Sequence, residues 1–269
     1  MKEQNLIYIA IIALVLVAIF LIVHKTSKVK FELRTMIVVS LMSLLSMVLA
    51  VYSLMIPLFG FPSLKFGFSQ LPIMITGALF GPWWGMVGGV LEDLLELASG
   101  TISTPYLGFT LNKALIGIIP GLVFILANKQ PKKMKTYITT FVGILYSCSI
   151  IFILTTDSVT AAQVTYMLSW PIKAILIALT LAILPLSYLI MKLLKFKDVD
   201  QRNLQAWLLS VIMIEILVNV ILTPIWLENM YGIPFVVQVV IRSVKASFFV
   251  VLNTFLAYFV HQNLKRLKR

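Results

Sequence analysis

Charged residues, cysteine and histidine are scarce in this sequence. Asp, Glu, Lys and Arg make up only 12% of its 269 residues, about half the share found in a soluble domain. The single cysteine, Cys148, excludes a disulfide framework and a cysteine-based metal site, and its apolar surroundings predict a packing role. The sequence contains no Gly-x-Ser-x-Gly, His-Glu-x-x-His or Walker A motif. We therefore expect no catalytic site, no metal and no cofactor.

Hydrophobic residues dominate instead. They form 60% of the chain, and the mean hydropathy is +1.01. Several apolar runs reach the ~20 residues that a helix needs to cross the hydrocarbon core of a bilayer, which predicts an all-α polytopic membrane protein. Nine segments are expected to enter the membrane: 6–23, 35–56, 66–79, 83–97, 106–127, 137–154, 170–191, 204–222 and 235–260.

The basic residues predict the orientation of the chain. Four loops or tails, within 25–34, 129–135, 192–202 and 265–269, hold four Lys or Arg each, sixteen of the 22 in all. If each of the nine segments crosses the membrane, all four lie on the side that the positive-inside rule assigns to the cytoplasm. The opposite loops, 57–65, 99–105, 155–168 and 224–234, hold only Lys65. We therefore expect an outside N-terminus and a cytoplasmic C-terminus, with His24 and His261 at the interface.

Two of the apolar segments, 66–79 and 83–97, are too short for ordinary spans. Phe80-Gly81-Pro82 joins them, and Gly and Pro favour turns, so a tight helical hairpin is expected. Short helices in a membrane protein usually line a cavity. A pair of steeply packed helices without any site is the alternative.

The last four segments suggest an internal repeat. Trp170-Pro-Ile-Lys173 and Arg242-Ser-Val-Lys245 each begin a similar apolar stretch with a central lysine, after a span and a polar outer loop. Repeats are common in transporters. The match is short, so a true duplication and a chance likeness of two hydrophobic hairpins both stay open.

A few charges remain inside the expected spans. Charge at this depth costs several kcal/mol unless it is paired or hydrated, so it is often functional. Glu92 and Asp93 lie at about the same depth as Lys113, at 1.5 Å per residue, and Glu215 matches Lys245 in the same way. These groups either neutralise one another without binding anything, or they belong to a ligand site.

Arg242 and Lys245 are the best candidates for ligand contact. Their i, i+3 spacing places them on one helix face, and Arg presents a planar fork that suits a carboxylate. Flat rings near the same level would suit a planar heteroaromatic ligand with carboxylates, although an aromatic belt at the interface explains them equally well. These rings belong to Phe66, Tyr106, Phe109, Trp226 and Tyr231.

Several motifs resemble a known family. Leu64-Lys65-Phe-Gly-Phe-Ser-Gln-Leu-Pro72 and Gly77-Ala-Leu-Phe-Gly-Pro-Trp-Trp-Gly85 resemble the substrate-binding S components of energy-coupling factor (ECF) vitamin transporters. Leu107-Gly-Phe-Thr-Leu111, Trp226-Leu with Tyr231-Gly-Ile-Pro-Phe235, and Arg242-x-x-Lys245 look most like the folate-specific branch. The resemblance covers about 34–128 and 204–262.

The resemblance implies a six-helix core that binds a vitamin near the outer face of a bacterial plasma membrane. A separate transmembrane coupling subunit and two cytoplasmic ATPases would drive uptake by toppling this subunit, which is not itself an enzyme. About three segments are extra here. The chain then divides into 1–33, an extra helix; 34–135, four core helices; 136–203, an extra hairpin; and 204–269, the last two core helices and a basic tail.

The resemblance also implies roles for particular residues. Loop 57–65 would act as a lid. The substrate would contact Lys65, Asp93, Phe109, Thr110, Asn112, Lys113, Trp226, Arg242 and Lys245. Small residues of the first core helix would pack against the coupling subunit: Ser40, Ser43, Ser46 and Ala50. Of these, only Ser46 and Ala50 keep the four-residue spacing that the family implies.

The sequence departs from the folate branch at three places. Lys65 stands where Arg is frequent, Lys113 replaces a small residue, and Thr223-Pro224 replaces an Asn-Thr pair. The lead hypothesis is capture of folate or a related vitamin. The alternatives are an S component for a different vitamin or precursor, and a membrane scaffold or enzyme subunit on the same fold with no transport role.

Overall fold

Helices dominate the structure, a computed structural model. It describes residues 2–26, 31–58, 61–100, 105–161, 164–167, 169–175, 177, 178, 181, 198–233 and 235–267. They group into two compact units: unit 1 comprises 1–54 and 67–126, and unit 2 comprises 55–66 and 127–269. Five described helices are long and apolar enough to cross a membrane. The prediction of an all-α polytopic membrane protein is confirmed, with two short β-hairpins added.

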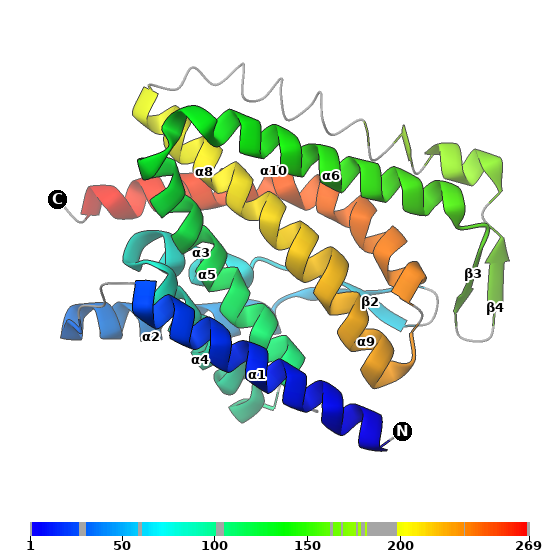
Figure 1. Ribbon diagram of the computed structural model, residues 1–269, viewed down its shortest axis with the longest axis horizontal. Helices are drawn as coiled ribbons and strands as arrows, with labels where there is room; N and C mark the ends of the chain where they lie inside the picture. Colours follow the sequence, from blue (N-terminus) through cyan, green and yellow to red (C-terminus); the bar gives the residue numbers. More distant parts are fainter. Residues whose placement is uncertain are drawn as a thin grey trace. The chain divides into compact units, whose positions relative to one another are not determined.

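Unit 1 is a helical bundle. Its elements are α1 (Lys2–Thr26), α2 (Leu33–Val51), α3 (Gln70–Phe80), α4 (Pro82–Ala98) and most of α5 (Leu107–Lys129) (Figure 1). The predicted short hairpin is confirmed, because α3 has 11 residues and α4 has 17. Gly81 makes the turn with φ 93°, a conformation that only glycine adopts readily, and Pro82 opens the first turn of α4.

Glycines bring α3, α4 and α5 into direct backbone contact. A Cβ on Gly117 of α5 would lie 2.0 Å from the Gly85 carbonyl oxygen, and a Cβ on Gly77 would lie 1.9 Å from that of Gly117. Any larger residue would force these helices apart. Small residues that permit such an approach are typical of helix packing in membranes.

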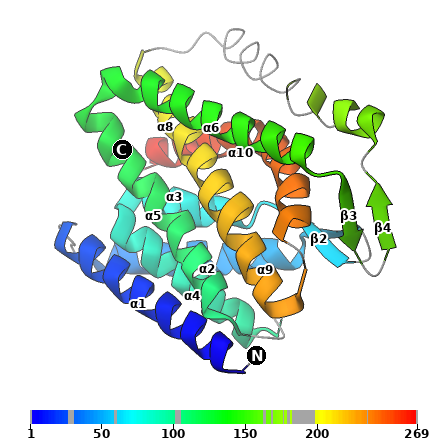
Figure 2. The ribbon, with the colours of Figure 1, turned by 45° about the vertical axis from the view of Figure 1, so that its right-hand side comes forward.

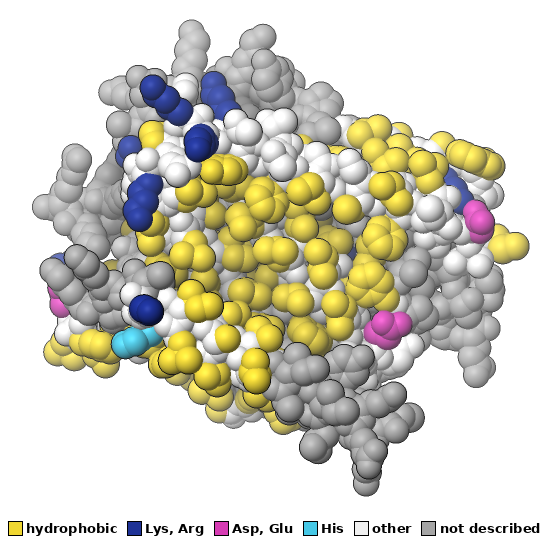
Figure 3. Space-filling model, viewed as in Figure 1, with side chains coloured by type: hydrophobic (Ala, Val, Ile, Leu, Met, Phe, Trp, Pro, Cys, Tyr) yellow, Lys and Arg dark blue, Asp and Glu magenta, His cyan; other side chains and the backbone are white. Residues whose placement is uncertain are grey.

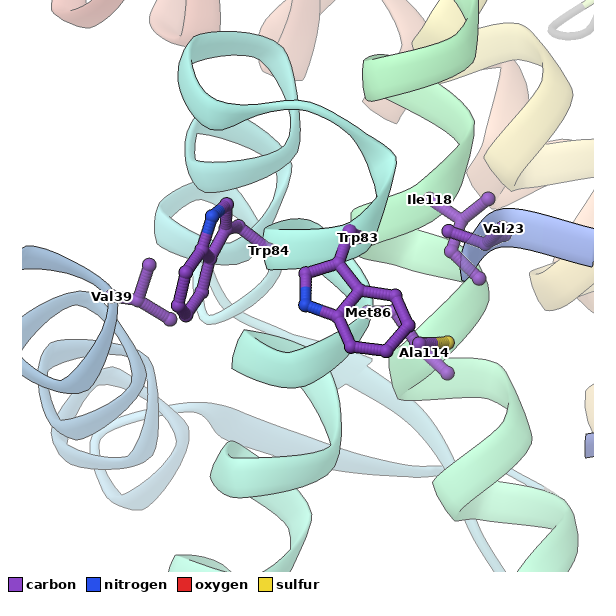
Figure 4. Packing of buried hydrophobic residues seen from close by; sticks show 7 residues of the cluster. All are labelled: Val23, Val39, Trp83, Trp84, Met86, Ala114 and Ile118. Carbon is purple, nitrogen blue, oxygen red and sulfur yellow. The ribbon is translucent and has the colours of Figure 1, made fainter. Parts of the chain in front are cut away.

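A cluster of buried hydrophobic side chains joins α1, α2, α4 and α5. Figure 4 shows Trp84 of α4 against Val39 of α2, while Trp83 lies near side chains of α5 and α1. The Trp83 ring also packs against the His24 ring of α1, with centroids 5.0 Å apart. Helix α1, expected to be an addition to the core, is therefore part of the same packed unit.

Three long helices lie side by side in unit 2. They are α6 (Met134–Thr155), which follows the short helix η1 (Pro131–Lys133); α8 (Asp198–Ile214); and α10 (Phe235–Leu267). Strands β3 (Ser158–Ala161) and β4 (Val164–Met167) form an antiparallel hairpin after α6 (Figure 2). Strands β1 (Leu54–Leu58) and β2 (Phe61–Phe66) pair as a second hairpin.

The charged side chains of unit 2 are segregated along its helices. On the face in Figure 3, Lys and Arg gather where α6 and α8 begin, and acidic side chains appear near β3 and α9. Hydrophobic side chains cover the helices between these ends. The middle of this face therefore has the apolar surface that a lipid-exposed helix bundle requires.

Two predicted boundaries are wrong. Residues 224–234 were expected to form a loop, but the helix continues from α8 through a π-helical segment, η2 (Glu215–Leu222), into α9 (Thr223–Tyr231). Pro224 is tolerated because it lies in the first turn of α9. The span expected over 35–56 ends at Val51, and the chain then enters the hairpin of β1 and β2.

Other expectations meet a more limited test. Cys148, predicted to be packed, is exposed on α6. Residues 170–175 are helical, but most of the segment expected over 170–191 lies outside the described residues. The first repeated pair is connected by a β-hairpin and the second by a helix, so the connections differ. The duplication and the boundaries at 33, 135 and 203 stay predictions.

Candidate functional site

Unit 1 contains a buried ionic cluster between α4 and α5, here called the acidic cluster: Glu92, Asp93, Glu96, Thr110 and Lys113. The Lys113 Nζ atom lies 2.5 Å from Oε1 of Glu92 and 3.0 Å from Oε1 of Glu96. The Thr110 hydroxyl donates to Oδ2 of Asp93 at 2.6 Å. The depth matching of Lys113 with a carboxylate in the sequence is therefore realised as an ion pair with Glu92.

Local geometry explains how this cluster forms. Glu92 and Glu96 are four residues apart on α4, so their side chains share a face, and Lys113 reaches both from α5. Gly89, one turn before Glu92, allows the approach: a Cβ there would lie 2.1 Å from the Lys113 carbonyl oxygen. The glycine contact thus places the lysine directly opposite the two glutamates.

The acidic cluster carries more acid than base. Glu92, Asp93 and Glu96 are 1%, 4% and 2% exposed. Lys113 is the cation whose field reaches Glu92 and Asp93, and it is also the one that pairs with Glu96. The Ser46 hydroxyl of α2 also interacts with the Glu92 carboxylate, so side chains from α2 and α5 together hold this acid in place.

Unit 2 contains a second cluster of opposite sign, here called the basic cluster: Gln238, Arg242 and Lys245 of α10 with Glu215 and Asn219 of η2. Nε of Arg242 donates to Oε1 of Gln238 at 3.2 Å. Nδ2 of Asn219 donates to Oε2 of Glu215 at 2.9 Å. The electrostatic neighbours of the Glu215 carboxylate are Lys245 and Arg242, as the depth matching of Glu215 with Lys245 suggested.

The π-helical segment presents these groups to α10. A π turn adds a residue to the helical repeat, and such turns are frequent at functional sites. The backbone N–H and the hydroxyl of Thr223 both donate to the Val218 carbonyl five residues earlier, the hydroxyl at 2.7 Å. Trp226, on the following turn of α9, is only 6% exposed.

The predicted substrate contacts divide between the two units. Unit 1 holds five of them, and among these Asn112 is 5% exposed and the Phe109 ring packs edge-on against Tyr106 at 6.0 Å. Unit 2 holds Trp226, Arg242 and Lys245. It also holds Lys65, whose backbone lies in β2 and whose side chain is outside the described residues. The structure therefore brings together Asp93, Thr110 and Lys113, and separately Arg242 and Lys245.

Two polar residues of the basic cluster were not predicted. Gln238 is 1% exposed, and its Nε2 atom has no hydrogen-bond partner within the described part of the chain. Asn219 donates a hydrogen bond to the Glu215 carboxylate. Helical spacing could have identified both residues. Gln238 lies four residues before Arg242, and Asn219 lies four residues after Glu215, so each shares a helix face with its charged partner.

Two residues expected elsewhere have structural roles. Lys173, described as central to a span, lies near the start of its helical stretch, 2.6 Å from the exposed carboxylate of Asp157. His261, expected at the membrane interface, is 2% exposed and accepts a hydrogen bond from Nε1 of Trp207 at 3.0 Å. The sequence position of His261 near a basic tail could not reveal the tryptophan 54 residues earlier.

The small residues assigned to coupling face two directions. Ser43, Ser46 and Ala50 are buried on α2; the Ser43 hydroxyl donates to the Gly88 carbonyl of α4 at 2.9 Å, and Ser46 donates to the Ser69 carbonyl. These three residues therefore pack within unit 1 rather than on its surface. Ser40 alone among the four is exposed.

No group of His, Cys, Asp or Glu within the described ranges has the arrangement needed to hold a metal ion. The family described as "ECF transporter, substrate-specific component" matches residues 34–244 of this chain, well over half of its length. No curated protein matches the chain. The matched region includes the acidic cluster, the basic cluster except Lys245, and the residues between the two resembling stretches.

Proposed function

Because the chain belongs to the family of ECF transporter substrate-specific components, we propose that it captures folate or a related vitamin for ATP-driven uptake. Membership makes it the substrate-binding subunit of an ECF transporter rather than an enzyme. The proposed partners are a transmembrane coupling subunit and two cytoplasmic ATPases. The proposed location is a bacterial plasma membrane, with the ligand entering from outside and the C-terminus in the cytoplasm.

The basic cluster is the observation that carries this proposal. Arg242 and Lys245 share one face of α10, and both lie near the Glu215 carboxylate, so the cluster as defined holds two basic side chains and one acidic one. Buried charge of this kind is stable only with a counter-charge. The carboxylates of folate would supply it, and Trp226 of the adjoining α9 would offer a flat surface to an aromatic ring.

A double substitution tests the basic cluster. We expect Arg242→Ala with Lys245→Ala to weaken folate binding to the purified chain by roughly a hundredfold, since each charge-assisted contact is worth about tenfold or more. Lys173→Ala is the matched control, because it removes a lysine whose partner, Asp157, is exposed. Folate affinity that survives the double substitution would remove the proposed site.

Coupling is tested separately from binding. We propose that the exposed face of α2, with Ser40, Leu41 and Leu44, contacts the coupling subunit. Replacing Ser40 by Trp should reduce copurification of the coupling subunit and ATPases while leaving folate binding intact. Copurification that is unaffected by the substitution would move the contact elsewhere on the chain.

A different vitamin or precursor is the second candidate ligand. The observation in its favour is Lys113, which joins the acidic cluster where the folate branch carries a small residue. Mass spectrometry of the small molecule that copurifies with the chain distinguishes the two candidates. If neither a small molecule nor the coupling subunit and ATPases copurify, a scaffold without a transport role becomes the better interpretation.

A further inference from the structure

We propose that Gln238 of the basic cluster is a specificity-determining residue, whose buried amide nitrogen donates a hydrogen bond to a carboxylate oxygen of the substrate. This inference rests on the proposed function, because it adds a residue to the binding site assigned there. A positive charge, as on Arg242 or Lys245, attracts any anion. A donor held at a fixed position also distinguishes an acceptor from a donor of the same shape.

The orientation of the Gln238 amide is the first argument. Nε of Arg242 donates to Oε1 of Gln238 at 3.2 Å. A guanidinium donates hydrogen bonds and accepts none, so the amide oxygen has to face the arginine and the amide nitrogen has to face elsewhere. The arginine therefore fixes which atom of this amide is left to meet another group, and that atom is the donor.

The unused donor is the second argument. Gln238 is 1% exposed, and its Nε2 atom has no hydrogen-bond partner among the residues that the structure describes. Buried polar groups in folded proteins are nearly always paired, because a buried group without a partner is costly. A substrate oxygen placed against Nε2 would remove this cost, so Gln238 would contribute to the affinity for a ligand that presents such an oxygen.

The position of Gln238 within the basic cluster is the third argument. Gln238, Arg242, Lys245 and Phe249 follow one another at spacings of four, three and four residues, so they lie along one face of α10. Nζ of Lys245 lies over the Phe249 ring, 4.7 Å from its centroid, whereas Nε of Arg242 is bonded to Gln238. The amide is thus the neighbour of the guanidinium, and the lysine extends to the next turn of the helix.

This arrangement selects a carboxylate over an amide or amino group. A side-chain amide nitrogen donates hydrogen bonds and accepts none, so a ligand NH2 group at the same place would oppose donor to donor. A carboxylate has two oxygens, and one of them would accept from Gln238 while the other meets the guanidinium. Hydrogen bonds to an ionised acceptor are the stronger ones. All of these residues belong to unit 2.

The first experiment measures the preference of the purified full chain for a carboxylate over an amide. The probes are N-(4-aminobenzoyl)-glutamate and its bis-amide, which has the same shape, and calorimetry gives their dissociation constants. We expect Gln238→Met to reduce the preference for the carboxylate roughly tenfold, the value of one charged hydrogen bond. Gln262→Met, near the other end of α10, is the matched control and should leave the preference unchanged. A purely structural role of Gln238 would weaken both probes alike.

The second experiment separates direct contact from an effect through the arginine. The same substitution is made in an Arg242→Ala chain. If Gln238 donates to the ligand, Gln238→Met should still reduce the preference for the carboxylate in that chain. If Gln238 only positions Arg242, the substitution should have no effect there, which would overturn the inference. If Gln238→Met does not fold, Gln238→Glu keeps an oxygen for Arg242 and should reduce the preference by more, because it adds a repulsion to the lost donor.

The outcomes separate this inference from the folate proposal. If folate binds the wild type but the preference between the probes does not depend on Gln238, the inference fails and the folate proposal stands. If folate does not bind although the preference depends on Gln238 with and without Arg242, the inference stands and the substrate is a different carboxylate. A wild type that binds neither probe would refute the carboxylate contact itself.

Discussion

The two units bury charged clusters of opposite sign and hold them by different means. In unit 1, the carboxylates of Glu92 and Glu96 pair with one lysine, between helices that glycines bring into backbone contact. In unit 2, Arg242 and Lys245 lie near the Glu215 carboxylate, and neutral amides from Asn219 and Gln238 bond to Glu215 and Arg242. The acidic cluster is therefore set by close helix packing, and the basic cluster by an irregular helix.

This difference bears on how each cluster tolerates change. Removing one partner of a buried ion pair leaves an uncompensated charge. A charge held by neutral amides keeps its hydrogen bond when the opposite charge is removed. We therefore expect substitutions in unit 1 to affect folding first and those in the basic cluster to affect ligand binding first.

Lys113→Met should have the largest effect. It leaves Glu92 and Glu96 buried without their cation, at a cost of about 3–5 kcal/mol in the free energy of unfolding. Lys173→Met, in unit 2, removes a lysine whose partner is 89% exposed and should cost only about 0–1 kcal/mol. Denaturant unfolding of both variants in detergent measures the difference. Equal losses would contradict the contrast between buried and exposed pairs.

Gly117→Ala tests the close helix packing of unit 1. Its Cβ would lie 2.0 Å from the Gly85 carbonyl oxygen, so α4 and α5 must separate, at about 1–3 kcal/mol. Gly143→Ala on α6 has open space around its Cβ and should stabilise its helix by up to ~1 kcal/mol. Melting temperatures that change in opposite directions would support the contrast; a common direction would refute it.

Glu215→Gln should affect binding more than folding. The substitution removes the acidic neighbour of Arg242 and Lys245 and keeps an acceptor for Asn219, so we expect folate to bind roughly tenfold more tightly. The measurement is the dissociation constant of the purified chain. Glu228→Gln on the exposed side of α9 is the control and should leave the constant unchanged. Weaker folate binding in Glu215→Gln would mean that Glu215 itself contacts the ligand.

Ser43→Ala should have the smallest effect. It removes an interhelical hydrogen bond to the Gly88 carbonyl, and such bonds in membrane proteins average about 0.6 kcal/mol. Ser40→Ala on the exposed face of the same helix should change the free energy of unfolding by less. A cost near that of Lys113→Met would show that α2 contributes far more to unit 1 than its hydrogen bonds suggest.

Local signals in the sequence were sufficient for part of this structure. Gly81 and Pro82 act on their own turn, so the short hairpin of α3 and α4 was predictable. Lys113 and Glu92 were matched by depth alone, because both depths follow from the helical rise. Thr223-Pro224 was misread as a helix end, since the π turn that accommodates it depends on the packing of η2 against α10.

The sequence by itself determined that this chain is an all-α polytopic membrane protein and which charges stay inside it. Apolar length and basic loops carry that information, because the bilayer acts on each segment separately. Only the tertiary structure decided which charges meet. It also turned Ser43 and Ser46 inward, because contacts between helices depend on which faces pack together, and hydropathy alone does not reveal those faces.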